Sequence, residues 1–185
     1  FFSQFTGAEL VADKWNLSRE DLDQFALESH QKAAQATESK YFDREILPVE
    51  GKNAEGINDL VMADEGIRFD ASLDKLAGLN PVTEGGVITA GNASQITDGA
   101  AAVVICNDAG LKKIQTNPRA EIVSISVVGD DPVFMLTGPI PASKKALETA
   151  NLSIDDMDLY EVNEAFAPVP LAWAVDLKAD KSKLN

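Results

Sequence analysis

The sequence has little of the chemistry on which small scaffold proteins and metal sites depend. One cysteine and one histidine occur in 185 residues. A single cysteine cannot form an internal disulfide, and one histidine with one cysteine falls short of the ligand clusters that bind zinc. The sequence therefore excludes a disulfide scaffold and a structural zinc site, and we expect no metal.

Basic residues and long apolar runs are scarce as well. Sixteen Lys and Arg stand against 30 Asp and Glu, which gives a formal net charge of −14. This charge argues against nucleic acid or anionic lipid as a general partner, so a polyanionic ligand must be held by a local group. No apolar run approaches the roughly 20 residues of a membrane-spanning helix, and no basic leader opens the chain. We therefore expect an intracellular, soluble protein without membrane insertion.

The chain does contain enough apolar residues to form a core. Forty-five per cent of its residues are apolar and 25% are charged, which is close to the composition of soluble globular proteins. It begins on Phe-Phe and stops at Lys-Leu-Asn without a finishing signal. We therefore expect a globular fragment of a longer polypeptide.

Helix and strand patterns alternate along the chain. Residues 18–40 carry apolar side chains at helical spacing, and Ser18 with Asp21 can cap that helix. Further helices are expected at 73–79, 108–115, 142–150 and 163–178, the last beginning late, near Ala167, because of two prolines. Strands are expected at 41–48, 100–106, 120–128 and 159–162, with 100–106 buried on both faces and 51–70 irregular. This alternation favours an α/β layered architecture with a boundary near residues 116–118.

Five strings occur in an order that is similar to the thiolase family. They are SREDLDQFALESHQKAAQA, YFDREILPV, TAGNASQITDGAAAVV, a DP…M…GP…A run over 131–142, and DLYEVNEAFA. Each string alone is common, but the five together cover nearly the whole chain. The resemblance implies a partial thiolase-like α/β fold: residues 1–116 would be the later part of the N-terminal domain, with a loop-domain portion over about 1–70, and residues 117–185 would open the C-terminal domain.

The resemblance also implies an activity. Thiolases cleave 3-ketoacyl-CoA with coenzyme A, or run the reverse Claisen condensation, through an acyl-cysteine intermediate; CoA is a substrate and no cofactor is bound permanently. The nucleophilic Cys and the catalytic His of the family belong to segments outside this chain, so the chain alone should be inactive. Homodimers or homotetramers are implied, in the cytoplasm of a bacterium or in a mitochondrion or peroxisome of a eukaryote.

Six residues match site positions of the family. Asn163 would hold a water in the oxyanion hole, although a helix N-cap is the competing interpretation. Ser94 and Ala90 would face the pantetheine arm, Met135 and Phe166 would line the acyl or pantetheine pocket, and Arg68 would contact the nucleotide end of CoA. Asp70 stands near Arg68, and its negative charge would be unfavourable beside the phosphates of CoA.

Three residues sharpen or limit this interpretation. Gln95 stands where degradative thiolases often have Gln, which favours fatty acid or steroid side-chain β-oxidation. Cys106, at the end of an apolar run, is expected to be a buried structural residue, and His30 a helix-surface or interface side chain.

Three alternatives remain open: a non-catalytic acyl-CoA-binding or scaffold protein of thiolase ancestry, a biosynthetic acetoacetyl-CoA thiolase, and a relative of β-ketoacyl synthases. Because each half would be incomplete, we also expect exposed apolar faces and an isolated chain that is insoluble or misfolded.

Overall fold

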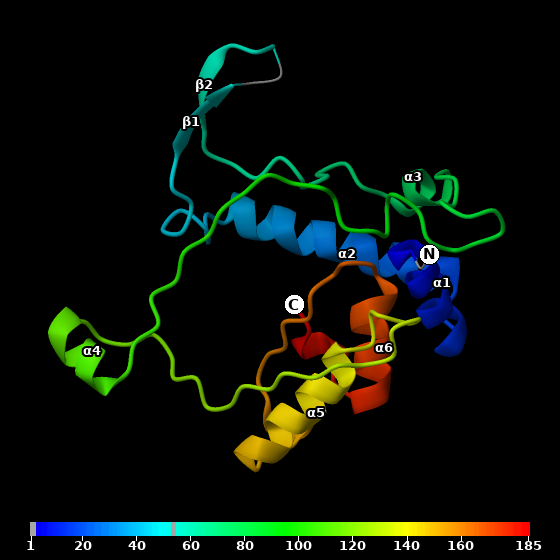
Figure 1. Ribbon diagram of the computed structural model, residues 1–185. Helices are drawn as coiled ribbons and strands as arrows, with labels where there is room; N and C mark the ends of the chain where they lie inside the picture. Colours follow the sequence, from blue (N-terminus) through cyan, green and yellow to red (C-terminus); the bar gives the residue numbers. More distant parts are fainter. Residues whose placement is uncertain (1–2, 53–54) are drawn as a thin grey trace.

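The computed structural model describes residues 3–52 and 55–185. Its helices and strands, in chain order, are α1 Gln4–Lys14, α2 Arg19–Glu38, β1 Val49–Lys52, β2 Asn58–Val61, α3 Leu73–Ala77, α4 Asp108–Ile114, α5 Pro139–Ala150, the 3-10 helix η1 Ile154–Asp156, α6 Pro168–Leu177 and the 3-10 helix η2 Lys181–Lys183. Helices α1, α2, α5 and α6 gather in one body, while the β1–β2 hairpin and α4 project away from it (Figure 1).

Helix α2 begins where the sequence predicts. The Asp21 backbone N–H donates to Ser18 Oγ at 3.1 Å, and the Ser18 backbone N–H donates back to Asp21 Oδ2 at 2.9 Å. This reciprocal capping box satisfies two N–H groups at the helix start. The Asp21 carboxylate accepts from the backbone N–H and from the hydroxyl of Ser18, and these two bonds lower its pKa. The helix places its apolar face, with Leu22 and Ala26, in the core.

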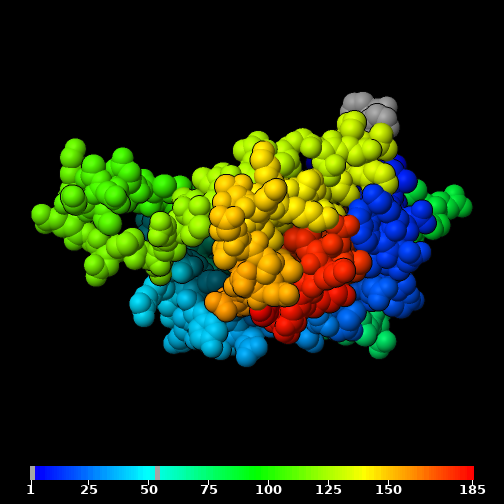
Figure 2. All heavy atoms as spheres, turned by 90° about the horizontal axis from the view of Figure 1, so that it is seen from below, coloured from blue at the N-terminus to red at the C-terminus, as the bar shows by residue number. Residues whose placement is uncertain are grey.

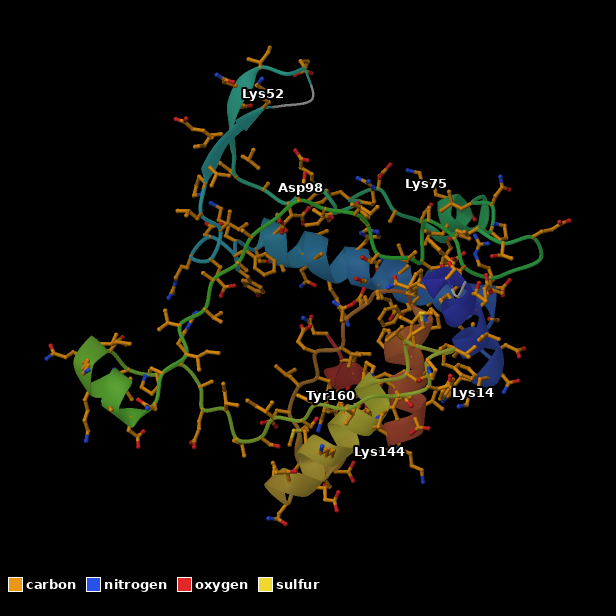
Figure 3. The ribbon with its side chains drawn as sticks, in the orientation of Figure 1. Lys14, Lys52, Lys75, Asp98, Lys144 and Tyr160 are labelled. Atoms are coloured by element: carbon orange, nitrogen blue, oxygen red, sulfur yellow. The ribbon has the colours of Figure 1, made fainter. Side chains whose placement is uncertain are left out.

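Helix α6 lies at the centre of the core. It joins one apolar cluster around Ala8 and Leu22 to a second around Tyr160 and Trp173, so it is apolar on nearly every side. It packs against both α1 and α5, and these three elements form a continuous surface in Figure 2. On the side of α5, Lys144, which is labelled in Figure 3, forms an ion pair with Asp176 of α6.

Prolines and an asparagine set the ends of α5 and α6. Helix α6 begins at Pro168, with Ala167 as its N-cap, so the expected late start is confirmed. Helix α5 begins at Pro139, earlier than expected, because a proline in the first turn loses no intrahelical hydrogen bond. Asn151 ends that helix in the left-handed region, at φ 55°.

Two predicted strands are absent from the ladders of the described residues. Segments 100–106 and 120–128 are extended but unpaired; the exposed fraction is 83% for Val103 and 83% for Val127. The prediction that 100–106 is doubly buried is therefore wrong for this chain. The segments run as an open arm on either side of α4 (Figures 1 and 2). A strand is stabilised by hydrogen bonds to its neighbours, and none of the described segments pairs with these two.

The remaining β predictions are also corrected. Residues 41–45 form turns, and the first strand begins only at Val49. The stretch 51–70, expected to be irregular, contains most of an antiparallel hairpin in which Val49 pairs with Val61 and Lys52 with Asn58. Residues 159–162 contribute a single bridge, Tyr160 to Leu184. Positions 1, 2, 53 and 54 of the expected loop-domain portion lie outside the described residues.

A buried amide fixes the turn that follows residue 88. Asn92 is 3% exposed; its Oδ1 accepts from the Thr89 backbone N–H at 2.8 Å, and its Nδ2 donates to Asp23 Oδ1 and to the Val87 carbonyl, each at 3.0 Å. Asp23 also accepts from Arg19 Nε at 2.7 Å. Helix α2 and the turn 87–94 are therefore locked together by one polar network in the core.

Of the helices that the structure describes, none is both long enough and apolar enough to cross a membrane.

The exposed arm predicts self-association. Expressed alone, the 185-residue chain should elute from size-exclusion chromatography as oligomers or aggregates, because extended apolar segments with unpaired backbone groups pair with those of other copies. Light scattering on the eluate measures this. A monodisperse monomer that melts cooperatively would contradict the prediction.

The Asn92 network predicts a strong charge effect. Asn92→Asp replaces a donor by a carboxylate facing Asp23, and should destabilise a soluble polypeptide containing this chain by about 3 kcal/mol at neutral pH. Acid that neutralises one of the two facing carboxylates relieves their repulsion, so the loss should shrink as the pH falls. Urea denaturation at several pH values measures it.

A matched variant tests whether the amide-to-acid change is harmful in itself. Asn107 caps α4, where its side chain accepts from the Gly110 backbone N–H, and Asp is an equally good cap. Asn107→Asp should therefore leave stability within about 0.5 kcal/mol. Equal losses from the two variants would show that the Asn92 network is not special.

Candidate functional site

The turn at Asn92 is packed too closely for larger residues. A Cβ added to Gly91 would lie 2.5 Å from Leu76 Cδ2 and 2.7 Å from Leu79 Cδ1. On the other side of the turn, the Glu9 carboxylate of α1 accepts from the backbone N–H groups of Val87 and Ile88 at 3.0–3.1 Å. The segment 87–94 is thus held from both sides.

This turn in turn holds the loop that precedes α6. The Ser94 backbone N–H donates to the Ala165 carbonyl at 3.0 Å, and the Ala167 N–H donates to the Asn92 carbonyl at 2.9 Å. A bridge between Ala93 and Phe166 lies between these two bonds. The pairing sets the loop 163–167 beside the turn, so two motifs that are far apart in the sequence meet.

A cavity of about 420 Å³ opens between these segments. Its walls come from α2, through Ser29 and His30, from the loop 64–67, from the turn 91–97 and from residues 163–167. Polar and apolar groups both line it. In the part of the chain that the structure describes, no cluster of His, Cys, Asp and Glu is suited to a metal ion.

Three of the predicted site residues line this cavity: Asn163, Ser94 and Gln95. Asn163 is exposed, and the cap of α6 is Ala167, so the competing interpretation of Asn163 as the helix cap does not hold. Within the described residues its side chain has no hydrogen-bond partner. Its amide is therefore available to a ligand as both donor and acceptor.

Arg68 lies at the edge of the cavity. Its Nη2 donates to Gln95 Oε1 at 3.4 Å, and its backbone N–H donates to His30 Nδ1 at 3.3 Å. Gln95 Nε2 donates to the Gly66 carbonyl at 2.6 Å. The loop that carries Arg68 is thereby tied to the turn through one amide side chain.

Asp70, which would disfavour a phosphate near Arg68, already has a partner. It forms an ion pair with Lys75, whose Nζ also donates to the Asp70 carbonyl at 2.9 Å. The hydrogen bond from Lys75 lowers the pKa of Asp70, with a smaller contribution from Arg68. The pairing offsets the negative charge beside the guanidinium.

Ala90, Met135 and Phe166 do not line the cavity. Ala90 is exposed outside it. Met135 adopts a left-handed backbone, at φ 47°, beside Gly7 of α1. Phe166 is 5% exposed, in the core, where its ring packs edge-on against that of Phe5 at 5.3 Å. The structure therefore brings together only part of the predicted set.

Cys106 was expected to be a buried structural residue, and His30 a helix-surface or interface side chain. Cys106 is exposed, so the prediction that it is buried is wrong; it ends the unpaired segment 100–106, which no strand of the described residues covers. His30 is partly buried and lines the cavity. Burial, and secondarily the charge of Arg68, lower its pKa and keep the ring neutral, as its acceptor role toward the Arg68 N–H requires.

Two cavity residues were missed by the sequence-based predictions. Ser29 Oγ donates to Glu164 Oε2 at 2.8 Å. Burial raises the pKa of Glu164, and this rise is opposed by the bond from Ser29 and by Lys32. The available signals were the position of Ser29 on the apolar face of α2 and the place of Glu164 next to Asn163.

Comparisons with known proteins agree with this architecture. The family described as "Thiolase, N-terminal domain" matches residues 4–109, and "Thiolase, C-terminal domain" matches residues 116–185. The steroid 3-ketoacyl-CoA thiolase FadA6 of Mycobacterium tuberculosis is 49% identical over 183 residues, which are 99% of this chain and 44% of that protein. The chain thus spans less than half the length of that relative.

Solved structures give the same result. The crystal structure of human mitochondrial 3-ketoacyl-CoA thiolase in complex with CoA superposes with a TM-score of 0.90 at 43% identity, covering 97% of this chain and 44% of that one. The acetyl-CoA acetyltransferase of Bacillus anthracis superposes with a TM-score of 0.93 at 40% identity, covering 100% and 47%. With both domain families matched in order along a chain that folds like these structures, the chain belongs to the thiolase family.

Proposed function

We propose that this chain supplies part of the acyl-CoA site of a thiolase that cleaves 3-ketoacyl-CoA with CoA through an acyl-cysteine intermediate. The observation that carries the proposal is the unpartnered carboxamide of Asn163 in a cavity shared with Ser94 and Gln95. Membership of the thiolase family supplies the reaction class. The matched ranges, 4–109 and 116–185, are consistent with a domain boundary near residue 116, and the loop-domain portion over about 1–70 stays a prediction.

Asn163 has the chemistry that a developing thioester oxyanion needs. A neutral amide can bind a water and direct its proton to an oxygen without changing charge. Such preorganised donors act most strongly where charge develops in the transition state, so Asn163 should contribute chiefly to kcat.

Ser94 and Arg68 are suited to the two ends of CoA. The exposed Ser94 hydroxyl offers a small polar group for the amides of a pantetheine arm. Arg68 supplies the local cation that a chain of net charge −14 requires in order to hold an anionic nucleotide. Ala90, Met135 and Phe166 stay predictions for the pantetheine and acyl walls.

Gln95 supports a degradative direction. Its side chain bonds both Gly66 and Arg68, so its amide shapes the cavity wall between them. The name of the Mycobacterium tuberculosis relative, a steroid 3-ketoacyl-CoA thiolase, is consistent with large acyl groups. A biosynthetic thiolase is the second candidate, favoured by the similarity to an acetyl-CoA acetyltransferase. Assembly as a homodimer or homotetramer belongs to the same proposal.

A non-catalytic acyl-CoA-binding protein is the alternative from another class. In favour of this alternative, the one cysteine of the chain, Cys106, is exposed and does not line the cavity, so the chain itself places no cysteine nucleophile at the site. An enzyme would need a nucleophile from residues outside this chain. Intact mass and peptide sequencing of the native polypeptide distinguish the two: further residues with a Gly-His-Pro motif and a cysteine motif support the enzyme, and a native polypeptide without them contradicts it.

Asn163→Ala should lower kcat of the full-length enzyme roughly 10²- to 10³-fold, because it removes one preorganised oxyanion partner. CoA-dependent release of acetyl-CoA from a 3-ketoacyl-CoA measures the rate. The exposed Asn117, outside the cavity, provides the control: Asn117→Ala should leave kcat unchanged. A kcat for Asn163→Ala within twofold of wild type would remove Asn163 from the mechanism.

Gln95→Gly should shift the ratio of kcat/KM for long-chain 3-ketoacyl-CoA over acetoacetyl-CoA by roughly tenfold in favour of the short substrate, a size of effect expected for changed pocket contacts. Both substrates are assayed with wild type and variant. Wild-type turnover of acetoacetyl-CoA with no turnover of long chains would instead support the biosynthetic candidate.

A further inference from the structure

The contact between Ser29 and Glu164 joins two parts of the chain that belong to different domain families. Ser29 lies on α2, within the range matched by the thiolase N-terminal domain, and Glu164 lies within the range matched by the C-terminal domain. Their 2.8 Å hydrogen bond is partly buried at the wall of the cavity, and both residues line it. The bond therefore connects the two domains at the site itself.

The contact also fills a gap in the anchoring of the loop 163–167. The C-terminal side of this loop is held by backbone bonds from Ser94 to Ala165 and from Ala167 to Asn92. Asn163 itself has no side-chain partner among the described residues. The Glu164 carboxylate is thus the side-chain anchor nearest to the Asn163 amide in the sequence.

The hydrogen bond between Ser29 and Glu164 is not the arrangement that would stabilise the fold most. Glu164 is half-buried, and in the described residues no cation pairs with it within salt-bridge distance. Lys32 attracts it from a distance but donates instead to the Leu184 carbonyl at 2.7 Å, and Glu161 repels it. A desolvated acid bonded to one hydroxyl costs stability compared with an apolar pair, and such groups cluster at functional sites.

We propose that Ser29 and Glu164 form a positioning pair that fixes the orientation of the Asn163 carboxamide in the assembled site. The inference rests on the proposed thiolase function. Glu164 acts through the loop that carries Asn163, not on the substrate, and Ser29 acts through Glu164. Because the adjoining backbone is already held at Ala165, small losses of alignment at Asn163 should affect the chemical step more than binding.

The first test is Ser29→Ala in the full-length enzyme. We expect kcat to fall about tenfold while KM stays within about twofold, because an interaction used in the transition state is misaligned and ground-state binding is not. The matched control is Ser153→Ala. Ser153 Oγ donates to Asp156 Oδ2 at the same 2.8 Å, but on η1, outside the cavity; its loss should leave kcat unchanged.

The second test separates positioning from folding. Glu164→Gln keeps an oxygen that can accept from Ser29 and should retain most of kcat, whereas Glu164→Ala should lose about as much as Ser29→Ala. The double variant Ser29→Ala with Glu164→Ala should be no worse than either single change, because both remove one interaction. Unchanged kcat in Ser29→Ala, additive losses, or no recovery with Gln would overturn the proposal.

A direct readout keeps this inference distinct from the proposed function. The NMR signals of the Asn163 side-chain amide should shift or broaden in Ser29→Ala and stay in place in Ser153→Ala. A wild-type enzyme without thiolase activity would reject the proposed function, and unmoved Asn163 signals would reject the positioning pair even if the enzyme is active.

Discussion

The buried amide of Asn92 is the interaction on which the geometry of the cavity depends. It joins the acid Asp23 of α2 to the backbone of the turn 87–94, and that turn then pairs with the loop before α6. An amide suits this position because it donates and accepts at the same time, so each of its neighbours is satisfied without a second charge. Arg19 balances the one charge in the network and also reaches the carbonyls at the end of α3, bringing a further segment to the same point.

One turn of α2 holds two walls of the cavity. Ser29 donates to the loop that carries Asn163, and the next residue, His30, accepts from the loop that carries Arg68. Side chains at successive helix positions diverge by about 100°, so adjacent residues can reach different segments. The end of the site proposed for the reacting thioester and the end proposed for the nucleotide are therefore both held by the same helix, α2.

The sequence predicted what depends on local chemistry and missed what depends on distant partners. The capping box at Ser18 and the late start of α6 follow from short-range rules, and both are confirmed. Segments 100–106 and 120–128 carry the residue types of strands, but pairing and burial require neighbours that no local pattern specifies.

The same limit applies to the site. The family motifs identified Asn163, Ser94 and Gln95, which the structure gathers at one cavity, because these residues lie within recognisable strings. The bond from Ser29 to Glu164 spans 135 positions, and no local sequence pattern predicts that these two residues are in contact. The burial expected for Cys106 failed for a related reason: it assumed a covering sheet that the described residues do not provide.

The packing of α1 against α6 has a consequence for the order of folding. These helices lie near opposite ends of the 185 residues, so their contact closes most of this stretch of the polypeptide into one loop. Loop closure of this kind carries an entropic cost before any contact compensates it, and folds dominated by such contacts form slowly. During synthesis, Ala8, Val11 and Ala12 emerge from the ribosome long before α6 exists to help bury them. The apolar face of α1 therefore stays without its α6 partner until all the residues between the two helices have been synthesised, and exposed apolar surface of this kind favours aggregation.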